Sequence, residues 1–142
     1  MADPTVPPAG YSGTPLAKKL GVGPAARVCV VAPPVDYRTL VQPWPEGATL
    51  VDRADRSTEI VHVFVRERAR LERELPRLRR WLRDDAVLWV SWPKKSARVA
   101  TDIDENVVRE VALPLGWVDV KVCAVDAVWS GLKLVVRRGL RS

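Results

Sequence analysis

The chain has 142 residues, a net charge of +6 at neutral pH and an apolar fraction of 47%. This is the composition of an ordinary globular protein, and no apolar run approaches the roughly 20 residues of a membrane-spanning helix. Residues 1–10 lack the basic start and the apolar middle of a signal peptide, so we expect a cytoplasmic protein without membrane contact. Arginine supplies most of the positive charge, which permits an anionic partner without requiring one.

Residues 1–13 are rich in proline and glycine, and we expect a flexible tail followed by a single domain at residues 14–142. The domain is predicted to begin with a short helix that has Thr14 as its N-cap, Pro15 as its first residue and Gly21 at its end. A further helix of about two turns is expected at 35–41. Strands are expected at 27–32, 48–52 and 59–65.

Residues 66–83 carry the longest helical pattern of the chain. A leucine stripe at helical spacing forms its buried side: Leu71, Leu75, Leu78 and Leu82. Pro76 falls inside this pattern and is expected to kink or restart the helix. The run at 86–92 that follows is almost wholly apolar, which indicates a central strand buried on both faces and ended by Pro93.

The last third of the chain predicts one helix and two strands. The helix is expected at 102–113, with Asp102 and Glu105 forming a start that resembles a capping box. The strands at 117–125 and 132–137 are joined by a short link containing Gly131, which predicts an antiparallel hairpin. The fold class is therefore α/β: a single Rossmann-like three-layer domain of about six strands, mostly parallel, with a C-terminal antiparallel hairpin.

This order of elements resembles the Rossmann-like fold of S-adenosylmethionine-dependent methyltransferases, truncated by one strand–helix unit. The resemblance places Asp52 where that family carries an acid for the cofactor ribose. It departs from the family after the first strand, where Ala32, Pro33 and Pro34 replace the glycine-rich cofactor loop. Two prolines remove two N–H donors and restrict the backbone, so no cofactor of the usual kind is expected and a non-catalytic protein is favoured over an enzyme.

Several long strings also resemble the signatures of an uncharacterised bacterial family, a domain of unknown function. They are GYSGTPLAKKLG at 10–21, LWVSWPKKS at 88–96, DVKVCAVD at 119–126 and VWSGLK at 128–133. This resemblance implies a bacterial origin and no established activity.

The candidate ligand site lies at the carboxyl edge of the sheet, where open α/β sheets bind ligands. Its core is the group Lys94, Lys95 and Ser96 after the central strand, which could grip a phosphate or carboxylate or could neutralise the acids at the start of the next helix. Tryptophans nearby could stack a flat ligand or fill the core, with Trp89 and Trp92 on opposite faces of their strand. The full candidate set is Thr14, Lys18, Asp52, Trp92, Lys94, Lys95, Ser96 and Trp129.

The helix at 66–83 also carries an arginine stripe: Arg66, Arg70, Arg73, Arg77 and Arg80. This stripe could bind nucleic acid or an acidic protein through its guanidinium groups. The favoured interpretation is a solvated face with pairs such as Glu67–Arg70 and Arg70–Glu74, because no nucleic-acid motif accompanies the stripe and no aromatic residue interleaves with it.

His62, Cys29 and Cys123 each lie within a strand pattern, and we expect a satisfied buried imidazole and two buried thiols with no metal. The favoured function is a non-catalytic, degenerate methyltransferase-like domain that binds a small anionic ligand or a protein partner. The alternatives are a divergent S-adenosylmethionine-dependent methyltransferase and a nucleic-acid-associated protein that uses the arginine stripe.

Overall fold

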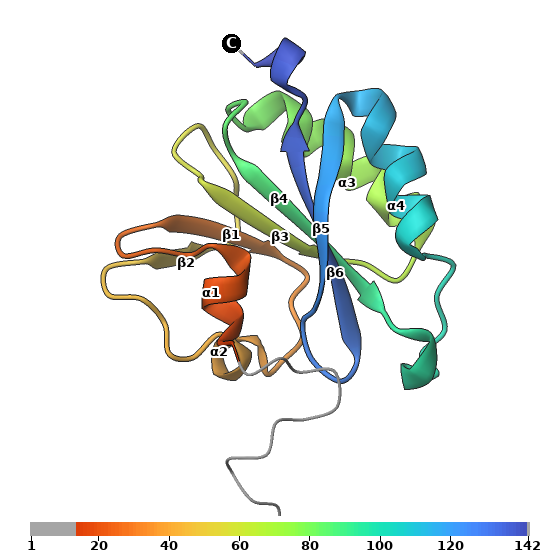
Figure 1. Ribbon diagram of the computed structural model, residues 1–142, viewed down its shortest axis with the longest axis horizontal. Helices are drawn as coiled ribbons and strands as arrows, with labels where there is room; N and C mark the ends of the chain where they lie inside the picture. Colours follow the sequence, from red (N-terminus) through yellow and green to blue (C-terminus); the bar gives the residue numbers. More distant parts are fainter. Residues whose placement is uncertain (1–13, 142) are drawn as a thin grey trace, which may run out of the picture.

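The computed structural model describes residues 14–141 and is built on one six-stranded sheet (Figure 1). The strands are β1 (Arg27–Val31), β2 (Thr49–Val51), β3 (Ile60–Phe64), β4 (Val87–Pro93), β5 (Trp117–Ala124) and β6 (Trp129–Val136). They lie in the order β2-β1-β3-β4-β6-β5. The first four strands are parallel, and β6 runs antiparallel to both β4 and β5. The predicted α/β class, mostly parallel sheet and C-terminal hairpin are confirmed.

Helices cover both faces of the sheet and make a three-layer arrangement (Figure 1). On one face lie α3 (Arg68–Trp81) and α4 (Glu105–Ala112), and on the other lie α1 (Leu16–Leu20) and α2 (Tyr37–Leu40). Three short 3₁₀ turns complete the chain: η1 (Lys95–Ala97), η2 (Leu113–Leu115) and η3 (Arg138–Leu140). The leucine stripe of α3 is buried as predicted, because its helical spacing presents one apolar side to the sheet.

The two tryptophans of β4 point to opposite faces, as the period of two residues along a strand requires. Trp89 belongs to the core under α1 and α2, and Trp92 to the core under α3 and α4. The indole N–H of Trp89 donates a hydrogen bond of 3.1 Å to the carbonyl oxygen of Leu20. This bond ties the end of α1 to the centre of the sheet.

Some predicted helix boundaries are wrong. Thr14 makes no cap: α1 begins at Leu16, one residue later than predicted, and Pro15 is its N-cap. α2 forms only one turn instead of about two. Helix α3 continues through Pro76 without restarting, since the proline removes only one backbone hydrogen bond while the leucine stripe keeps both halves on the sheet.

The start of α4 also differs from the prediction. Asp104, and not Asp102, is its N-cap, and the Asp104 carboxylate accepts a 2.9 Å hydrogen bond from the N–H of Val107. The carboxylate of Asp102 instead accepts a 2.7 Å bond from the N–H of Arg68, at the start of α3. Each acid therefore satisfies a free N–H group at the beginning of a different helix.

No helix among residues 14–141 is long and apolar enough to cross a membrane. Cys29 is buried as predicted and Cys123 is half-buried, and both are free thiols. Within the same residues, no group of three or more His, Cys, Asp or Glu side chains is placed to hold a metal ion. The tail expected at 1–13 lies outside the described residues.

Candidate functional site

The single histidine of the chain lies in a buried row of polar side chains. Tyr37 Oη is 3.0 Å from His62 Nδ1, and Ser91 Oγ is 2.7 Å from His62 Nε2. Burial lowers the pKa of His62 to about 3 and raises that of Tyr37 above its ordinary value, so the imidazole is neutral at pH 7. All three side chains are closed off from solvent. His62 is thus the satisfied core histidine that was predicted, and no substrate can reach Ser91.

A more accessible site lies at the carboxyl ends of β1 and β3. The chain leaves β1 toward β2 on one side and leaves β3 toward β4 on the other, which makes this the point where ligands bind in open α/β sheets. A cavity of about 270 Å³, here called the switch-point cavity, lies there. Its lining combines the turn after β1, the last residue of β3 and the segment after it, one residue of α3 and one of β6: Ala32, Pro33, Pro34, Phe64, Val65, Arg66, Glu67, Arg70 and Trp129.

The switch-point cavity has a fixed aromatic wall and free basic groups. Trp129 packs edge-to-face against Phe64 with ring centroids 5.0 Å apart, and its backbone N–H donates a 2.7 Å hydrogen bond to the carboxylate of Asp126. Arg66 and Arg70 are exposed, and within residues 14–141 their guanidinium groups have no ion pair or hydrogen bond. The cavity can therefore offer charged donors beside a flat indole.

Asp52 lies in a different cavity, of about 640 Å³, beside the turn after β1. It follows β2 and is exposed. Pro33 and Pro34 separate this cavity from the switch-point cavity, because they line both. Val35 stands fully exposed on its rim.

The arginines of the predicted stripe face solvent, but the ion pairs expected for them do not form among the described residues. All five are exposed, and neither Glu67–Arg70 nor Arg70–Glu74 forms an ion pair in the described chain. The ion pairs that do form within residues 14–141 use other acids and arginines outside the stripe: Arg68, Arg79, Arg83 and Arg109. The stripe is therefore a solvent-exposed face, as the favoured interpretation has it, but without the two expected ion pairs.

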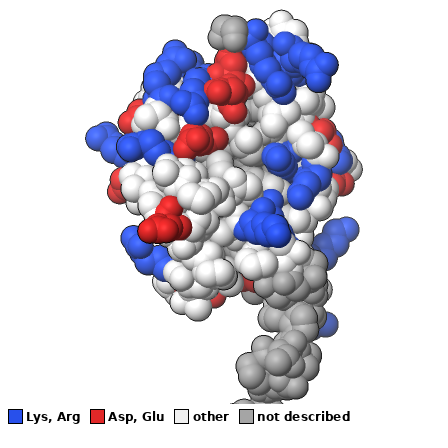
Figure 2. Space-filling model, turned by 60° about the vertical axis from the view of Figure 1, so that its left-hand side comes forward, with Lys and Arg blue, Asp and Glu red and all other residues white. Residues whose placement is uncertain are grey.

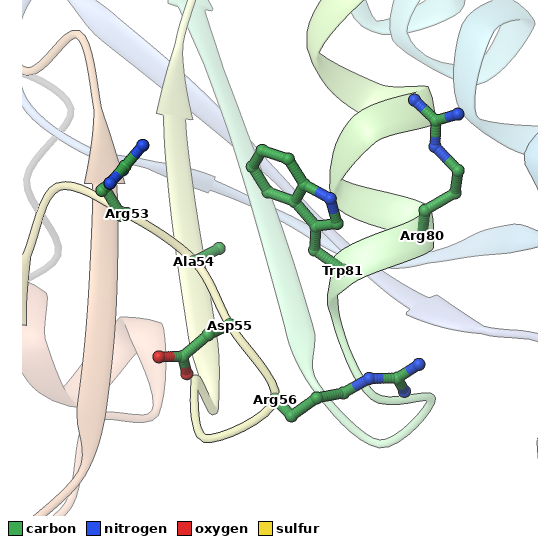
Figure 3. Close-up of a pocket in the computed structure, with 6 residues that line it drawn as sticks. All are labelled: Arg53, Ala54, Asp55, Arg56, Arg80 and Trp81. Carbon is green, nitrogen blue, oxygen red and sulfur yellow. The ribbon is translucent and has the colours of Figure 1, made fainter.

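Three residues absent from the sequence-based candidates lie beside the stripe. Arg53 and Arg56, in the loop between β2 and β3, line a cavity with Arg80 and Trp81 at the end of α3 (Figure 3). The i,i+4 spacing of Arg77 and Trp81 was the one available signal for an aromatic residue on this face. Nothing in the sequence pattern brings the β2–β3 loop to the end of α3. Basic side chains form several groups on the face at the β2 edge, around a wide uncharged area (Figure 2).

Lys94 and Lys95 line a cavity of about 580 Å³ at the end of β4, together with Trp92. The opposite wall is acidic and includes Asp102, Asp104 and Glu105. No ion pair within 4 Å joins either lysine to these acids in the part of the chain that the structure describes. This wall makes the lysine pair a poorer place for an anion than its sequence indicates.

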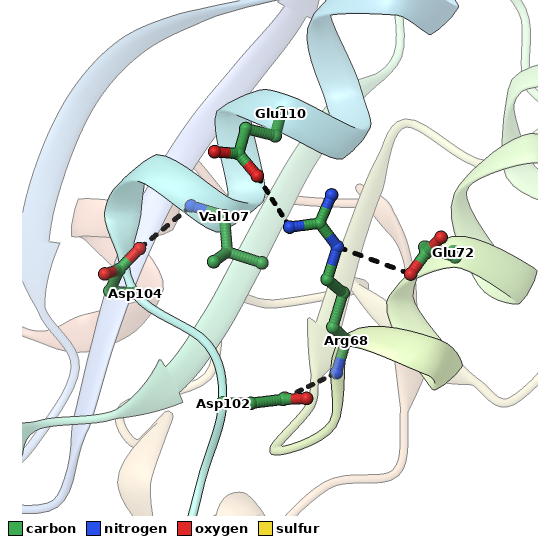
Figure 4. A network of polar contacts seen from close by, with 6 residues as sticks. All are labelled: Arg68, Glu72, Asp102, Asp104, Val107 and Glu110. Atoms are coloured by element: carbon green, nitrogen blue, oxygen red, sulfur yellow. Dashed lines mark hydrogen bonds and ion pairs between the residues drawn. The ribbon is translucent and has the colours of Figure 1, made fainter.

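Asp102 and Glu105 of this wall form polar contacts with residues of α3 and α4. The N–H of Arg68 donates a hydrogen bond to the carboxylate of Asp102, and the Arg68 guanidinium lies 2.6 Å from Glu110 and 3.4 Å from Glu72 (Figure 4). Hydrogen bonding to Glu110 raises the pKa of Arg68 above its ordinary value. Glu105 pairs with Arg109 at 3.1 Å. Asp102 and Glu110 therefore join α4 and the segment before it to Arg68 of α3, and the lysines form no direct pair with the acids of this wall among the described residues.

The remaining candidates lie elsewhere. Thr14 and Lys18 line a cavity of about 490 Å³ against β5. Ser96 is exposed in η1. The structure thus divides the predicted ligand residues among separate cavities, and it joins Trp129 with Arg66 and Arg70, which the sequence assigned to a different surface.

No protein-family model matches the chain, and no curated protein matches it. The relation to the bacterial family therefore remains a prediction. Solved structures do match. A Sulfolobus solfataricus protein assigned to the type 11 methyltransferases has a TM-score of 0.61 and 11% identity, over 89% of this chain and 92% of the other. The chain has a methyltransferase-like fold. A ribosomal protein L11 methylase from Lactobacillus delbrueckii subsp. bulgaricus matches with a TM-score of 0.55 and 10% identity, over 87% of this chain and 76% of the other.

The residues present do not fit S-adenosylmethionine in the manner of that fold. The turn after β1 adopts a left-handed conformation at Ala32, with φ of 52°, but Pro33 and Pro34 then offer no N–H group. The N–H of Tyr37 already donates to the carbonyl oxygen of Pro34 at 3.0 Å. Asp52 follows β2 and lines the cavity beside this turn, where the two prolines offer no N–H donor to a cofactor.

Proposed function

We propose that the protein is a non-catalytic domain of methyltransferase fold that binds a small anionic ligand in the switch-point cavity. The observation that supports this most directly is the pair Arg66 and Arg70. Both line the cavity, and neither guanidinium has a carboxylate partner within residues 14–141. Glu67 is the one acid among the lining residues, so their net charge is +1 (two Arg minus one Glu).

The shape of the cavity favours a small planar anion. A guanidinium group binds a carboxylate or phosphate through two parallel hydrogen bonds, which a lysine cannot do. Trp129 offers a flat apolar surface beside these donors. The volume of about 270 Å³ lies below the roughly 300–1,000 Å³ of sites for drug-sized ligands. An aromatic carboxylate or an aryl phosphate combines an anionic group with a flat ring and meets all three conditions.

The proposal excludes catalysis because of the turn after β1, where Pro33 and Pro34 lie. Pro33 and Pro34 line both the switch-point cavity and the neighbouring cavity of Asp52. They remove the backbone donors that a nucleoside cofactor would need between the two. His62 cannot act as a base, because it is fully buried and bonded on both ring nitrogens.

A thermal-shift titration with inorganic phosphate, phenyl phosphate and benzoate tests the proposal. A ligand at a hundred times its dissociation constant adds about 2.7 kcal/mol to the free energy of unfolding. We expect phenyl phosphate or benzoate to raise the melting temperature of the wild type. The double variant Arg66→Gln/Arg70→Gln should lose this rise, while Lys94→Gln/Lys95→Gln, which removes the same charge at the neighbouring cavity, should keep it.

Two results would overturn the proposal. If the rise disappears in the lysine variant and persists in the arginine variant, the ligand site is the cavity at the end of β4. If S-adenosylmethionine at millimolar concentration raises the melting temperature and Asp52→Asn abolishes that rise, the protein is a divergent methyltransferase instead.

A further inference from the structure

A second basic surface lies at the opposite edge of the sheet, away from the switch-point cavity. The loop between β2 and β3 passes close to the end of α3, and together they line an open pocket of about 500 Å³ (Figure 3). Arg53 and Arg56 come from the loop, and Arg80 and Trp81 come from the helix. We call these four residues, together with Arg73 and Arg77 of the same helix, the arginine–tryptophan surface.

The positive charge of this surface is not compensated by its surroundings. Arg53, Arg56 and Arg80 are exposed, and none of their guanidinium groups pairs with an acid within the described residues. The one acid of the cavity, Asp55, turns its carboxylate toward its own loop and away from Trp81 (Figure 3). There it accepts a 2.7 Å hydrogen bond from the N–H of Ser57. The lining residues therefore carry a net charge of +2 (three Arg minus one Asp).

Trp81 gives this surface an exposed aromatic plane. Trp81 is 45% exposed, whereas the other five tryptophans are buried or half-buried. The guanidinium carbon of Arg77 lies 4.9 Å from the centre of its ring and supports the indole from the preceding turn of α3. An indole held in this way, beside free guanidinium groups, can stack on an unpaired base.

We infer that the arginine–tryptophan surface binds single-stranded nucleic acid. Arg73, Arg77 and Arg80 follow α3 at spacings of four and three residues and can contact successive phosphates. From Arg73 to Trp81 the helix rises about 12 Å, which matches about three to four stacked nucleotides. A single strand is favoured over a duplex because only an unpaired base can stack on Trp81. It is favoured over an acidic protein because carboxylates would make no use of the indole.

Fluorescence anisotropy with labelled 12-nucleotide dT and rU strands tests this inference in 50 mM salt. A 12-base-pair duplex and poly-glutamate are the comparison ligands. We expect the wild type to bind the single strands at least tenfold more tightly than either comparison ligand. Trp81→Ala should weaken binding about tenfold, and Trp81→Phe should stay within about threefold of the wild type, because a benzene ring still stacks.

The salt dependence separates phosphate contacts from net charge. Each phosphate contact on a single strand contributes about 0.7 to the slope of log affinity against log salt, so Arg53→Gln/Arg56→Gln should lower that slope by about 1.4. The matched control Lys94→Gln/Lys95→Gln loses the same charge at the other edge and should keep the slope. Trp81 is a surface side chain and Arg53 and Arg56 lie in a loop, so these variants should melt within a few degrees of the wild type.

Three outcomes would overturn the inference: wild-type affinity in Trp81→Ala, an equal loss of slope in the two double variants, or poly-glutamate binding as tightly as the single strands. The last would assign the surface to an acidic protein. Because Arg66 and Arg70 are left intact, none of these outcomes decides whether the switch-point cavity binds its anion.

Discussion

Acidification from pH 7 to pH 5 should destabilise the protein through one side chain, His62. In the folded protein burial lowers the pKa of His62 to about 3, whereas in the unfolded chain it has the ordinary value of about 6.5. Between these two values the unfolded state binds a proton that the folded state does not. Stability is therefore fully present above pH 6.5 and is lost as the pH falls from 6.5 toward 3.

The size of the effect follows from the difference in proton binding. Protonation of the unfolded imidazole between pH 7 and pH 5 lowers the free energy of unfolding by about 2 kcal/mol. The interval lies above the ordinary pKa values of Asp and Glu, which are about 3.9 and 4.3. His62 is the one histidine of the chain, so the effect can be assigned to it.

Urea unfolding followed by circular dichroism at pH 7, 6 and 5 measures this loss directly. The control is His62→Gln, which has no titratable group at this position and should show a flat free energy of unfolding over the same interval. A flat wild-type curve, or the same decline in His62→Gln, would refute the reasoning. If the variant does not fold, the nitrogen chemical shifts of the wild-type imidazole provide the check, since they must remain those of a neutral ring at pH 5.

Three further predictions concern local structure. Asp104→Ala should lower the free energy of unfolding by about 1 kcal/mol through the lost cap of α4, and Asp104→Asn should cost much less, both measured by urea unfolding. Gly21→Ala should lower the free energy of unfolding by about 1 kcal/mol, because Gly21 ends α1 with a left-handed φ of 84°. The control Gly23→Ala should change the melting temperature little, because Gly23 has an ordinary φ and open space at its Cβ position. Burial, with nearby carboxylates, raises the pKa of the Cys29 thiol to about 11. In a Cys123→Ser variant, Cys29 should therefore react with a disulfide reagent at pH 8 at least 100-fold more slowly in the folded protein than in urea. Equal rates in the two states would contradict the burial of Cys29.

Much of the fold could be read from local patterns. The spacing of Leu71, Leu75 and Leu78 predicts a helix with one apolar side, and the structure buries that side. The almost wholly apolar run at 86–92 predicts a central strand, and β4 lies between two neighbours in the sheet. These predictions succeed because the side-chain period is a property of the local backbone. Helix ends were less predictable: at the start of α4, Asp102 and Asp104 both suit an N-cap, and only the packing of α3 against α4 decides that Asp102 caps α3 instead.

The local sequence pattern did not predict which of the candidate residues share a cavity. Sequence reasoning grouped Lys94 and Lys95 with Trp129 because all follow or precede a strand at one edge of the sheet, yet the structure puts the lysines in one cavity and Trp129 in another. It assigned Arg66 to a separate helical face, although the order β1-β3-β4 brings Arg66 beside Trp129.

The sequence by itself therefore determined the order of the strands and longer helices along the chain, the buried side of α3 and the core position of His62, but not where several elements begin and end. Only the tertiary structure decided that Arg66 and Arg70 share a cavity with Trp129, and that Arg53 and Arg56 meet Trp81 across 25 or more positions of chain. The physical reason is that side-chain alternation depends on a few neighbouring residues. The meeting of loops depends on strand order and on the paths of the crossovers, which are set by the packing of the whole sheet.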